Sequence, residues 1–277
     1  MPSSINRRPE RPERRSDPRS RFLPGPRPRR IAHRGFALDG AENTMRAFED
    51  ALAAGADMLE TDTRATRDGL ALAFHDEDLI RVAGDERRID QLSAQEAGAV
   101  RVAGDEPLAM LEDVLDTFRD VPINVDIKNA AAIGPAVAAI ARTRSADRVC
   151  VASFEGDVVR KTVATIQAAT GTLPVRSPSR GVIGSFLAAR AVEAPAPVIR
   201  RILAPYGALQ VPPVYQGIPV VTPANVAAAH RAGCEVHVWT IDDAPTMQEL
   251  LVMGVDGIIT NRVDLLSELL TNSPGSL

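Results

Sequence analysis

Seven side chains that can do chemistry stand at the ends of four short apolar segments in the first half of the 277-residue chain. In chain order they are His33, Arg34, Glu60, Asp62, His75, Asp126 and Lys128. Three carboxylates that converge repel one another unless a cation neutralises them. Their oxygens suit a hard divalent cation, Mg²⁺ or Ca²⁺, better than a soft metal. The residue types therefore indicate a metal site with histidines and basic side chains beside it.

The spacing of these residues supports their convergence. Glu60 and Asp62 are two positions apart, so both point to one face of an extended segment. The segment 123–128 alternates fully between apolar and polar residues, which turns Asn124, Asp126 and Lys128 to one face. Each signal is weak when taken singly, and the hypothesis depends on all of them lying together.

Lys128 is unusual in composition, because only two of the 32 basic residues are lysines. It follows Asp126 by two positions on the same face, where a compact ammonium beside a metal carboxylate would suit a phosphate oxygen. The alternative is an internal ion pair between Asp126 and Lys128. Considered as a pair alone, that is the better explanation.

The elements that must position these side chains alternate between strand and helix. The predicted strands are 30–34, 58–63, 70–75, 122–128, 148–153, 173–177, 235–241 and 256–260. The predicted helices are 44–54 with Asn43 as its cap, 111–119, 130–142, 157–169, 224–232 and 246–253. This alternation predicts an α/β fold, a closed (β/α)₈ TIM barrel whose catalytic residues lie at the C-terminal strand ends. A tight turn at Asp68-Gly69 separates the second and third strands, and the Pro-rich stretch 194–222 stays unassigned.

Charge divides the chain into two parts. The first 30 residues hold ten Arg against three acidic residues, a net +7, which leaves −11 for the other 247 residues. We predict a disordered Arg/Pro-rich tail over residues 1–28 and one barrel domain over 29–277. The tail contains a single aromatic residue, Phe22, and does not interleave aromatic residues with its arginines, so no nucleic-acid partner is expected.

Several protein classes are excluded by what the sequence lacks. No apolar run approaches the ~18 residues of a membrane span, and no apolar stretch of a signal peptide follows the basic start. Cys150 and Cys234 form neither a disulfide framework nor a zinc pattern. A cytoplasmic protein without transmembrane segments is the expectation. His237 is predicted to be a core residue and His230 a surface residue.

These motifs resemble the glycerophosphodiester phosphodiesterase family in order along roughly residues 30–270. The matching segments are His33-Arg34-Gly35, Glu42-Asn43-Thr44, Glu60-Thr61-Asp62, Phe74-His75-Asp76, Asn124-Val125-Asp126-Ile127-Lys128, Ser153-Phe154, Val238-Trp239-Thr240 and Gly254 to Thr260. The resemblance implies a (β/α)₈ barrel with a small insertion after the third strand, near 76–110. It also implies hydrolysis of a small-molecule glycerophosphodiester to an alcohol and glycerol 3-phosphate with one divalent cation.

Roles follow from the resemblance by position. The metal ligands would be Glu60, Asp62 and Asp126, with Glu42 as a fourth contributor. The acid–base pair would be His33 and His75, one activating the nucleophile and one protonating the leaving alkoxide. The phosphate would be held by Arg34 and Lys128, and Trp239 would line the substrate pocket. Neither the headgroup nor the oligomeric state follows from the sequence.

The chain departs from the family pattern at three positions. Asp126 stands where the family usually has Glu, and Val82 replaces a common Thr. Asn261 stands where an Asp commonly follows the Ile-Ile-Thr run, and its role is predicted to be structural. Two alternatives remain open: a lysophospholipase D that uses the same residues, which an apolar rim in the insertion or around 195–221 would favour, and a barrel that binds phosphodiesters without turnover.

Overall fold

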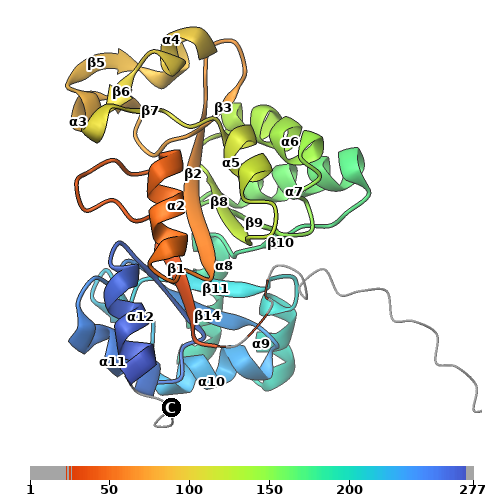
Figure 1. Cartoon of the computed structure of the whole chain (residues 1–277). Helices are drawn as coiled ribbons and strands as arrows, with labels where there is room; N and C mark the ends of the chain where they lie inside the picture. The colour runs from red at the N-terminus through yellow and green to blue at the C-terminus, as the bar shows by residue number, and fades with distance from the viewer. Residues whose placement is uncertain (1–22, 24, 26, 273–277) are drawn as a thin grey trace, which may run out of the picture.

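Eight parallel strands form a nearly closed barrel in the computed structural model, which describes residues 23, 25 and 27–272 (Figure 1). The barrel strands are β1 (Arg29–His33), β2 (Met58–Ala65), β8 (Ile123–Ile127), β9 (Val149–Ala152), β10 (Val175–Arg176), β11 (Ala208–Val211), β14 (Glu235–Val238) and β15 (Gly257–Thr260). They pair in the order β10-β9-β8-β2-β1-β15-β14-β11. The predicted (β/α)₈ barrel is confirmed.

The barrel closes through one backbone contact between β10 and β11. The Gly207 N–H donates to the Arg176 carbonyl at 3.2 Å. A Cβ at Gly207 would lie 2.5 Å from Val175 Cγ1, so the absence of a side chain at residue 207 lets the two ends approach.

The prediction that 70–75 is a barrel strand is wrong. That segment holds β3 (Ala71–Ala73), which pairs antiparallel with β2 across the turn at Gly69. A tight turn returns the chain alongside its own strand, whereas a parallel neighbour needs a long crossover. The eighth barrel strand is instead β11, inside the stretch left unassigned in the sequence.

Nine helices of the described chain that span seven or more residues surround the barrel (Figure 1). They are α2 (Met45–Ala53), α5 (Leu111–Thr117), α6 (Ile133–Arg142), α7 (Gly156–Thr170), α8 (Arg180–Ala191), α9 (Ala196–Leu203), α10 (Pro223–Arg231), α11 (Ala244–Val252) and α12 (Val263–Asn272). No helix among residues 27–272 is long and apolar enough to cross a membrane. The sequence patterns identified six of the nine and missed α8, α9 and α12.

The cap of α2 differs from the prediction. Thr44, not Asn43, accepts a hydrogen bond from the Ala47 backbone N–H at 3.2 Å. Asn43 has a left-handed backbone and turns its side chain inward, where Oδ1 accepts from Thr61 Oγ1 at 2.7 Å. Asn43 thus supports the carboxylate strand instead of the helix.

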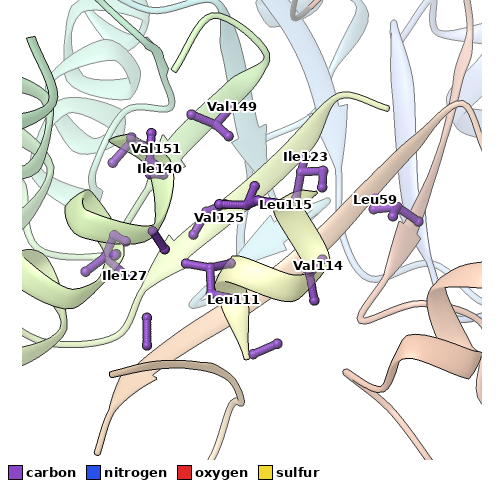
Figure 2. Packing of buried hydrophobic residues seen from close by; sticks show 14 of the residues in the cluster. Leu59, Leu111, Val114, Leu115, Ile123, Val125, Ile127, Ile140, Val149 and Val151 are labelled. Atoms are coloured by element: carbon purple, nitrogen blue, oxygen red, sulfur yellow. The ribbon is translucent and has the colours of Figure 1, made fainter. Parts of the chain in front are cut away.

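The main core fills the space between the barrel and its helices. Figure 2 shows Leu111, Leu115 and Ile140 from α5 and α6 packed over the strands. The apolar residues of β8 face outward into this core and are completely buried. Because side chains alternate along a strand, Asn124 and Asp126 face the barrel interior, as the sequence pattern predicts.

The predicted insertion forms a small separate layer, at the top of Figure 1. It contains β4 (Asp78–Leu79), α3 (Ile80–Ala83), β5 (Asp85–Arg88), η1 (Ile89–Gln91), α4 (Ala94–Gly98), β6 (Arg101–Val102), η2 (Ala103–Asp105) and β7 (Glu106–Pro107). Its own apolar cluster includes Leu72, Phe74, Leu79 and Leu92. Since it follows directly after His75, it borders the carboxyl ends of the strands.

Most of the predicted tail lies outside the described residues. Leu23 packs against the inner cluster of the barrel, and Arg27 forms ion pairs with Glu235 at 3.0 Å and Asp256 at 2.9 Å. Contacts with the barrel therefore begin before residue 28, at the amino ends of the strands. Cys150 and Cys234 are buried and are not joined by a disulfide.

Candidate active site

One cavity of about 340 Å³ opens at the carboxyl ends of the barrel strands. Eight of the nine side chains to which the resemblance assigns a role line it: His33, Arg34, Glu60, Asp62, His75, Asp126, Lys128 and Trp239. The ninth, Glu42, is not among the lining residues and instead accepts from Arg34 and Arg81. Residues in or directly after each of the eight barrel strands contribute to its wall. The structure thus brings together residues that are up to 226 positions apart, from His33 to Ile259.

Strand register aligns the polar side chains of the cavity. His33 lies opposite Glu60 where β1 pairs with β2, and Asp62 lies opposite Asp126 where β2 pairs with β8. Parallel pairing with an unbroken register places these four residues at two successive inward-facing positions of three neighbouring strands. His75 joins them from the loop after β3.

Lys128 lies between two of the carboxylates. Its Nζ is 2.6 Å from Asp62 Oδ1 and 2.7 Å from Asp126 Oδ2. Arg34 Nε is 3.0 Å from Asp62 Oδ2, without hydrogen-bond geometry. The ion pair that the sequence offered as the alternative therefore exists, and it includes Asp62 as well as Asp126.

The pKa values of the three carboxyl groups are shifted in different directions. Burial raises the pKa of Glu60 well above its usual range, and the charge of Asp62 adds to the shift. Burial also raises the pKa of Asp126, although the Lys128 ammonium opposes it. For Asp62 the effect of burial is outweighed by Lys128 and Arg34, which lower the pKa. The cations of the chain therefore compensate Asp62 but not all three carboxylates.

The donor set fits a hard divalent cation in chemistry and charge. In this structure no group of three or more His, Cys, Asp or Glu side chains among the described residues is arranged to hold a metal ion. Lys128 holds Asp62 and Asp126 instead, while Glu60 accepts only the Arg34 backbone N–H at 3.1 Å and has His33 Nε2 at 4.0 Å. A buried carboxyl with so little compensation is where added positive charge is most favourable.

His33 is anchored through one ring nitrogen. Its Nδ1 lies 2.8 Å from Asn261 Oδ1, so Asn261 contacts a residue of the site although its role was predicted to be structural. Burial lowers the pKa of His33, and the positive charge of Arg34 lowers it further. A histidine in this state carries an unprotonated nitrogen at neutral pH.

His75 is anchored by a charged partner. Its Nδ1 lies 2.6 Å from Asp76 Oδ1, and the other oxygen of Asp76 accepts from Arg81 Nε at 2.6 Å. Arg81 and Arg34 both donate to Glu42. Glu42 therefore ties the insertion to the site by ion pairs, and its pKa is lowered by these two guanidinium groups despite its burial.

One wall of the cavity is apolar, and part of it lies in the stretch 195–221, where an apolar rim would favour a lysophospholipid. Ile183 and Leu187 were not anticipated from the sequence. The residues of this wall are Phe154, Ile183, Leu187, Pro212, Tyr215, Val220 and Trp239. Phe154 stacks edge-to-face on Trp239, and the Arg180 guanidinium lies 4.1 Å from the centre of the Phe154 ring. Only Trp239 and Phe154 stand in motifs that sequence comparison singles out. The other residues come from α8 and the segment after β11, which showed no clear periodicity.

Two histidines lie outside the cavity. His237 is completely buried with Nε2 at 3.0 Å from Glu235, as predicted for a core residue. His230 is exposed on α10, as predicted, and its Nε2 lies 2.6 Å from Asp256.

The arrangement can bind an anion and transfer protons to it. Two cationic side chains, a carboxylate cluster and two anchored imidazoles face one enclosed space. Such a set can neutralise phosphate oxygens while it moves protons to and from neighbouring oxygens.

Comparisons with known proteins agree in the family they indicate. The model of the glycerophosphoryl diester phosphodiesterase family matches residues 33–265. A Mycobacterium tuberculosis protein named probable glycerophosphodiester phosphodiesterase 2 is 36% identical over 241 residues, 87% of this chain and 89% of the relative. A human lysophospholipase D is 37% identical over 111 residues, 35% of each chain. A solved Oleispira antarctica phosphodiesterase, in complex with the product sn-glycerol-3-phosphate, shares the fold with a TM-score of 0.68 at 17% identity, covering 88% of this chain and 97% of its own.

Proposed function

The chain belongs to the glycerophosphoryl diester phosphodiesterase family, and on this premise we propose that its cavity hydrolyses glycerophosphodiesters to an alcohol and glycerol 3-phosphate with one divalent cation and two histidines. One observation carries the proposal. His33 and His75 line the same cavity, and a partner outside it engages Nδ1 of each ring. In both residues Nε2 is the nitrogen left for a substrate.

The two histidines are proposed to take different roles. His33 has a neutral amide as its partner and a lowered pKa, which suits a general base that accepts a proton at Nε2. His75 has the Asp76 carboxylate as its partner, and this negative charge stabilises an imidazolium that can donate a proton to the leaving alkoxide oxygen. A hydroxyl nucleophile, water or the substrate's glycerol hydroxyl, would lose its proton to His33 and form the new bond to phosphorus, while the P–O bond to the alcohol breaks as His75 delivers its proton to the leaving oxygen.

The phosphate is proposed to lie against the basic side chains. Arg34 and Lys128 would hold its oxygens and reduce the negative charge that repels a nucleophile. Glu60, Asp62 and Asp126 would hold the cation, which supplies further positive charge when bound. Because Lys128 contacts Asp62 and Asp126 in this structure, its ammonium would share these carboxylates with the cation.

Choline release from glycerophosphocholine tests the proposal. The purified full chain would be assayed with Mg²⁺, with Ca²⁺ and with EDTA. We expect turnover with at least one cation and none with EDTA, and a fall of about 10²- to 10⁴-fold for His33→Ala and for His75→Ala. Absence of turnover with either cation would contradict the activity. Full activity of either variant would contradict the acid–base roles.

A second candidate substrate is a lysophospholipid. The apolar wall formed by Ile183, Leu187 and Val220 favours it, because an acyl chain needs apolar surface beside the phosphate site. The relative that matches over 111 residues is named a lysophospholipase D. Lysophosphatidylcholine in the same assay separates the two substrates. If an acyl chain uses this wall, Leu187→Glu lowers turnover of the lysolipid while turnover of glycerophosphocholine is maintained.

A further inference from the structure

A chain of hydrogen bonds leads from Asp242 through Asn261 to His33. Asp242 Oδ1 accepts from the Asn261 backbone N–H at 2.8 Å and from Thr260 Oγ1 at 2.9 Å. Asp242 Oδ2 accepts from Asn261 Nδ2, also at 2.8 Å. On its other side, Asn261 Oδ1 is 2.8 Å from His33 Nδ1. Both side-chain atoms of Asn261 are therefore engaged.

Only one assignment of donors and acceptors fits the hydrogen bonds from Asp242 through Asn261 to His33. A carboxylate accepts hydrogen bonds and donates none, so the amide nitrogen of Asn261 must face Asp242. The amide oxygen then faces His33 and can only accept, which requires a hydrogen on His33 Nδ1. In the neutral imidazole the other nitrogen, Nε2, consequently carries none. Nε2 is the ring nitrogen 4.0 Å from Glu60 Oε2, beside the cavity.

We propose that Asp242 and Asn261 are positioning residues that select the Nδ1–H tautomer of His33 and aim its bare Nε2 into the cavity. The proposal rests on the proposed function, because that tautomer matters only if His33 accepts a proton there. Asn261 acts on the ring directly, and Asp242 acts through Asn261.

The pair also explains why residue 261 is an Asn. An Asp at this position would place a carboxylate oxygen where Nδ2 now lies, 2.8 Å from Asp242 Oδ2. Two carboxylates at that distance repel strongly. Asp242 and Asn261 are thus matched to each other, and a change at one position requires a change at the other.

A reciprocal exchange of the two residues tests the proposal. In Asp242→Asn, the new amide nitrogen would face Asn261 Nδ2, so Asn261 turns over and offers a donor to His33 Nδ1. We expect the ring to switch to the Nε2–H tautomer and kcat to fall at least about 10-fold with KM little changed. In the double variant Asp242→Asn/Asn261→Asp, the amide introduced at position 242 donates to the carboxylate introduced at position 261, and that carboxylate accepts from His33 Nδ1–H. The double variant should recover kcat to within about threefold of the wild type.

The tautomer itself is read by ¹⁵N NMR of the histidine rings at alkaline pH, where the rings are neutral. The His33 signals are assigned by their loss in His33→Gln. Asp243→Asn is the matched control, because this neighbouring side chain only caps α11 and Asn caps equally well. The control should keep both the tautomer and kcat.

Different results would reject the positioning role of Asp242 and Asn261 and the proposed phosphodiesterase activity. The proposal is overturned if wild-type His33 carries its hydrogen on Nε2, if Asp242→Asn leaves the tautomer unchanged, or if the double variant stays as slow as the single one. If the tautomers behave as expected but the wild type cleaves no phosphodiester, the proposed function fails instead. Unchanged thermal unfolding of Asp242→Asn, alongside reduced kcat, supports positioning over a general structural role.

Discussion

His33 and His75 are held through the same ring nitrogen by partners of different charge. The partner of His33 is an amide, and the partner of His75 is the Asp76 carboxylate, which Arg81 in turn binds. A neutral partner orients a ring without favouring its cation, whereas a carboxylate does both. This difference is the structural basis for assigning a base and an acid to two residues that the sequence presents alike.

Asp76→Asn tests whether the charge of the His75 partner matters for catalysis. Asn can still accept from His75 Nδ1–H, but the negative charge beside the imidazolium is lost, as is the ion pair with Arg81. We expect kcat for glycerophosphocholine to fall about 10- to 100-fold, as is typical when a partner that orients an active-site group is changed. Steady-state kinetics with the preferred cation measure the effect.

Asp78→Asn is the control for this substitution. Asp78 lies two residues further on in the insertion, where Oδ1 accepts from the Ile80 backbone N–H. Its kinetics should match the wild type. If Asp76→Asn were equally active, the carboxylate would have no part in proton transfer by His75.

At the scale of elements, the connection from β1 to α2 holds the site in place. Gly35 follows His33 and Arg34 with a φ of +85°, and a Cβ there would lie 2.7 Å from the Ala47 backbone. The Phe36 N–H donates to the Ala47 carbonyl at 2.8 Å. Strand and helix therefore meet backbone to backbone at residue 35, and α2 cannot move without moving Arg34.

Gly35→Ala should destabilise the protein more than Gly69→Ala. Both glycines have left-handed backbones, at +85° and +83°, so both variants incur about 1–2 kcal/mol of backbone strain. A Cβ at Gly69 would meet nothing within 4 Å, whereas at Gly35 it adds a clash of about 1–3 kcal/mol. Urea unfolding of the two variants measures the difference. Equal losses would show that the Ala47 contact does not constrain the turn.

Elements also show why part of the fold was predictable and part was not. The alternation in β8 is local, so its inward and outward faces could be assigned from sequence. The eighth barrel strand could not, because β11 lies between prolines in a stretch without periodicity. The segment 70–75 has the composition of a barrel strand. Only its antiparallel pairing with β2, which the sequence does not show, distinguishes it from a parallel barrel strand.

The candidate site was more accessible to sequence reasoning than its surroundings. Its carboxylates, histidines and Lys128 stand at strand ends, where polar residues contrast with apolar neighbours. The apolar wall has no such contrast, and Leu187 is indistinguishable in sequence from any helix residue that packs on a core. The partnership of Asn261 with His33 joins residues 228 positions apart, so only the folded barrel shows it.

For the whole molecule, the uneven charge of the chain has a structural counterpart at the amino ends of the strands. There Arg27 and Arg29 bind the acidic residues Glu235 and Asp256, at the opposite end of the barrel from the cavity. Arg29 is almost completely buried, while Arg27 is 56% exposed. Arg27, which precedes the barrel domain, and Arg29, the first residue of β1, thus contribute to the end of the barrel opposite the cavity.

Two truncations separate the predicted tail from this contact. Deletion of residues 1–22 should leave turnover and Tm unchanged. Deletion of residues 1–28 should also maintain turnover, because the cavity is distant, but it should lower Tm by about 2–8 °C. This range corresponds to about 1–2 kcal/mol from an exposed ion-pair group and partly buried Leu23. Calorimetry and the choline assay measure both properties. A loss of turnover with either deletion would contradict the prediction that residues 1–28 are a tail outside the catalytic barrel domain.

Glu235, at the amino ends of the strands, makes the free energy of unfolding depend on pH. Burial alone would raise its pKa, but hydrogen bonds from Arg29 and His237 outweigh burial and lower the pKa to about 2. Because the folded value lies below the unfolded value, near 4.5, Glu235 contributes stability that is complete above pH 4.5 and is lost as the pH falls towards 2. The shift corresponds to about 3 kcal/mol.

Glu235→Gln removes this titration, so the free energy of unfolding of the variant should fall less steeply than that of the wild type between pH 5 and 3. The variant is expected to be about 3–5 kcal/mol less stable at pH 7, because buried Arg29 loses its charged partner. The difference in free energy of unfolding between the two proteins should therefore become smaller as the pH falls. Urea unfolding at pH 7, 5, 4 and 3 measures it, with exposed Glu249→Gln on α11 as the matched control that follows the wild type. If the difference in free energy of unfolding stayed constant from pH 7 to 3, the Arg29–Glu235 pair would not lower the pKa of Glu235. Packing would then stabilise this end of the barrel instead.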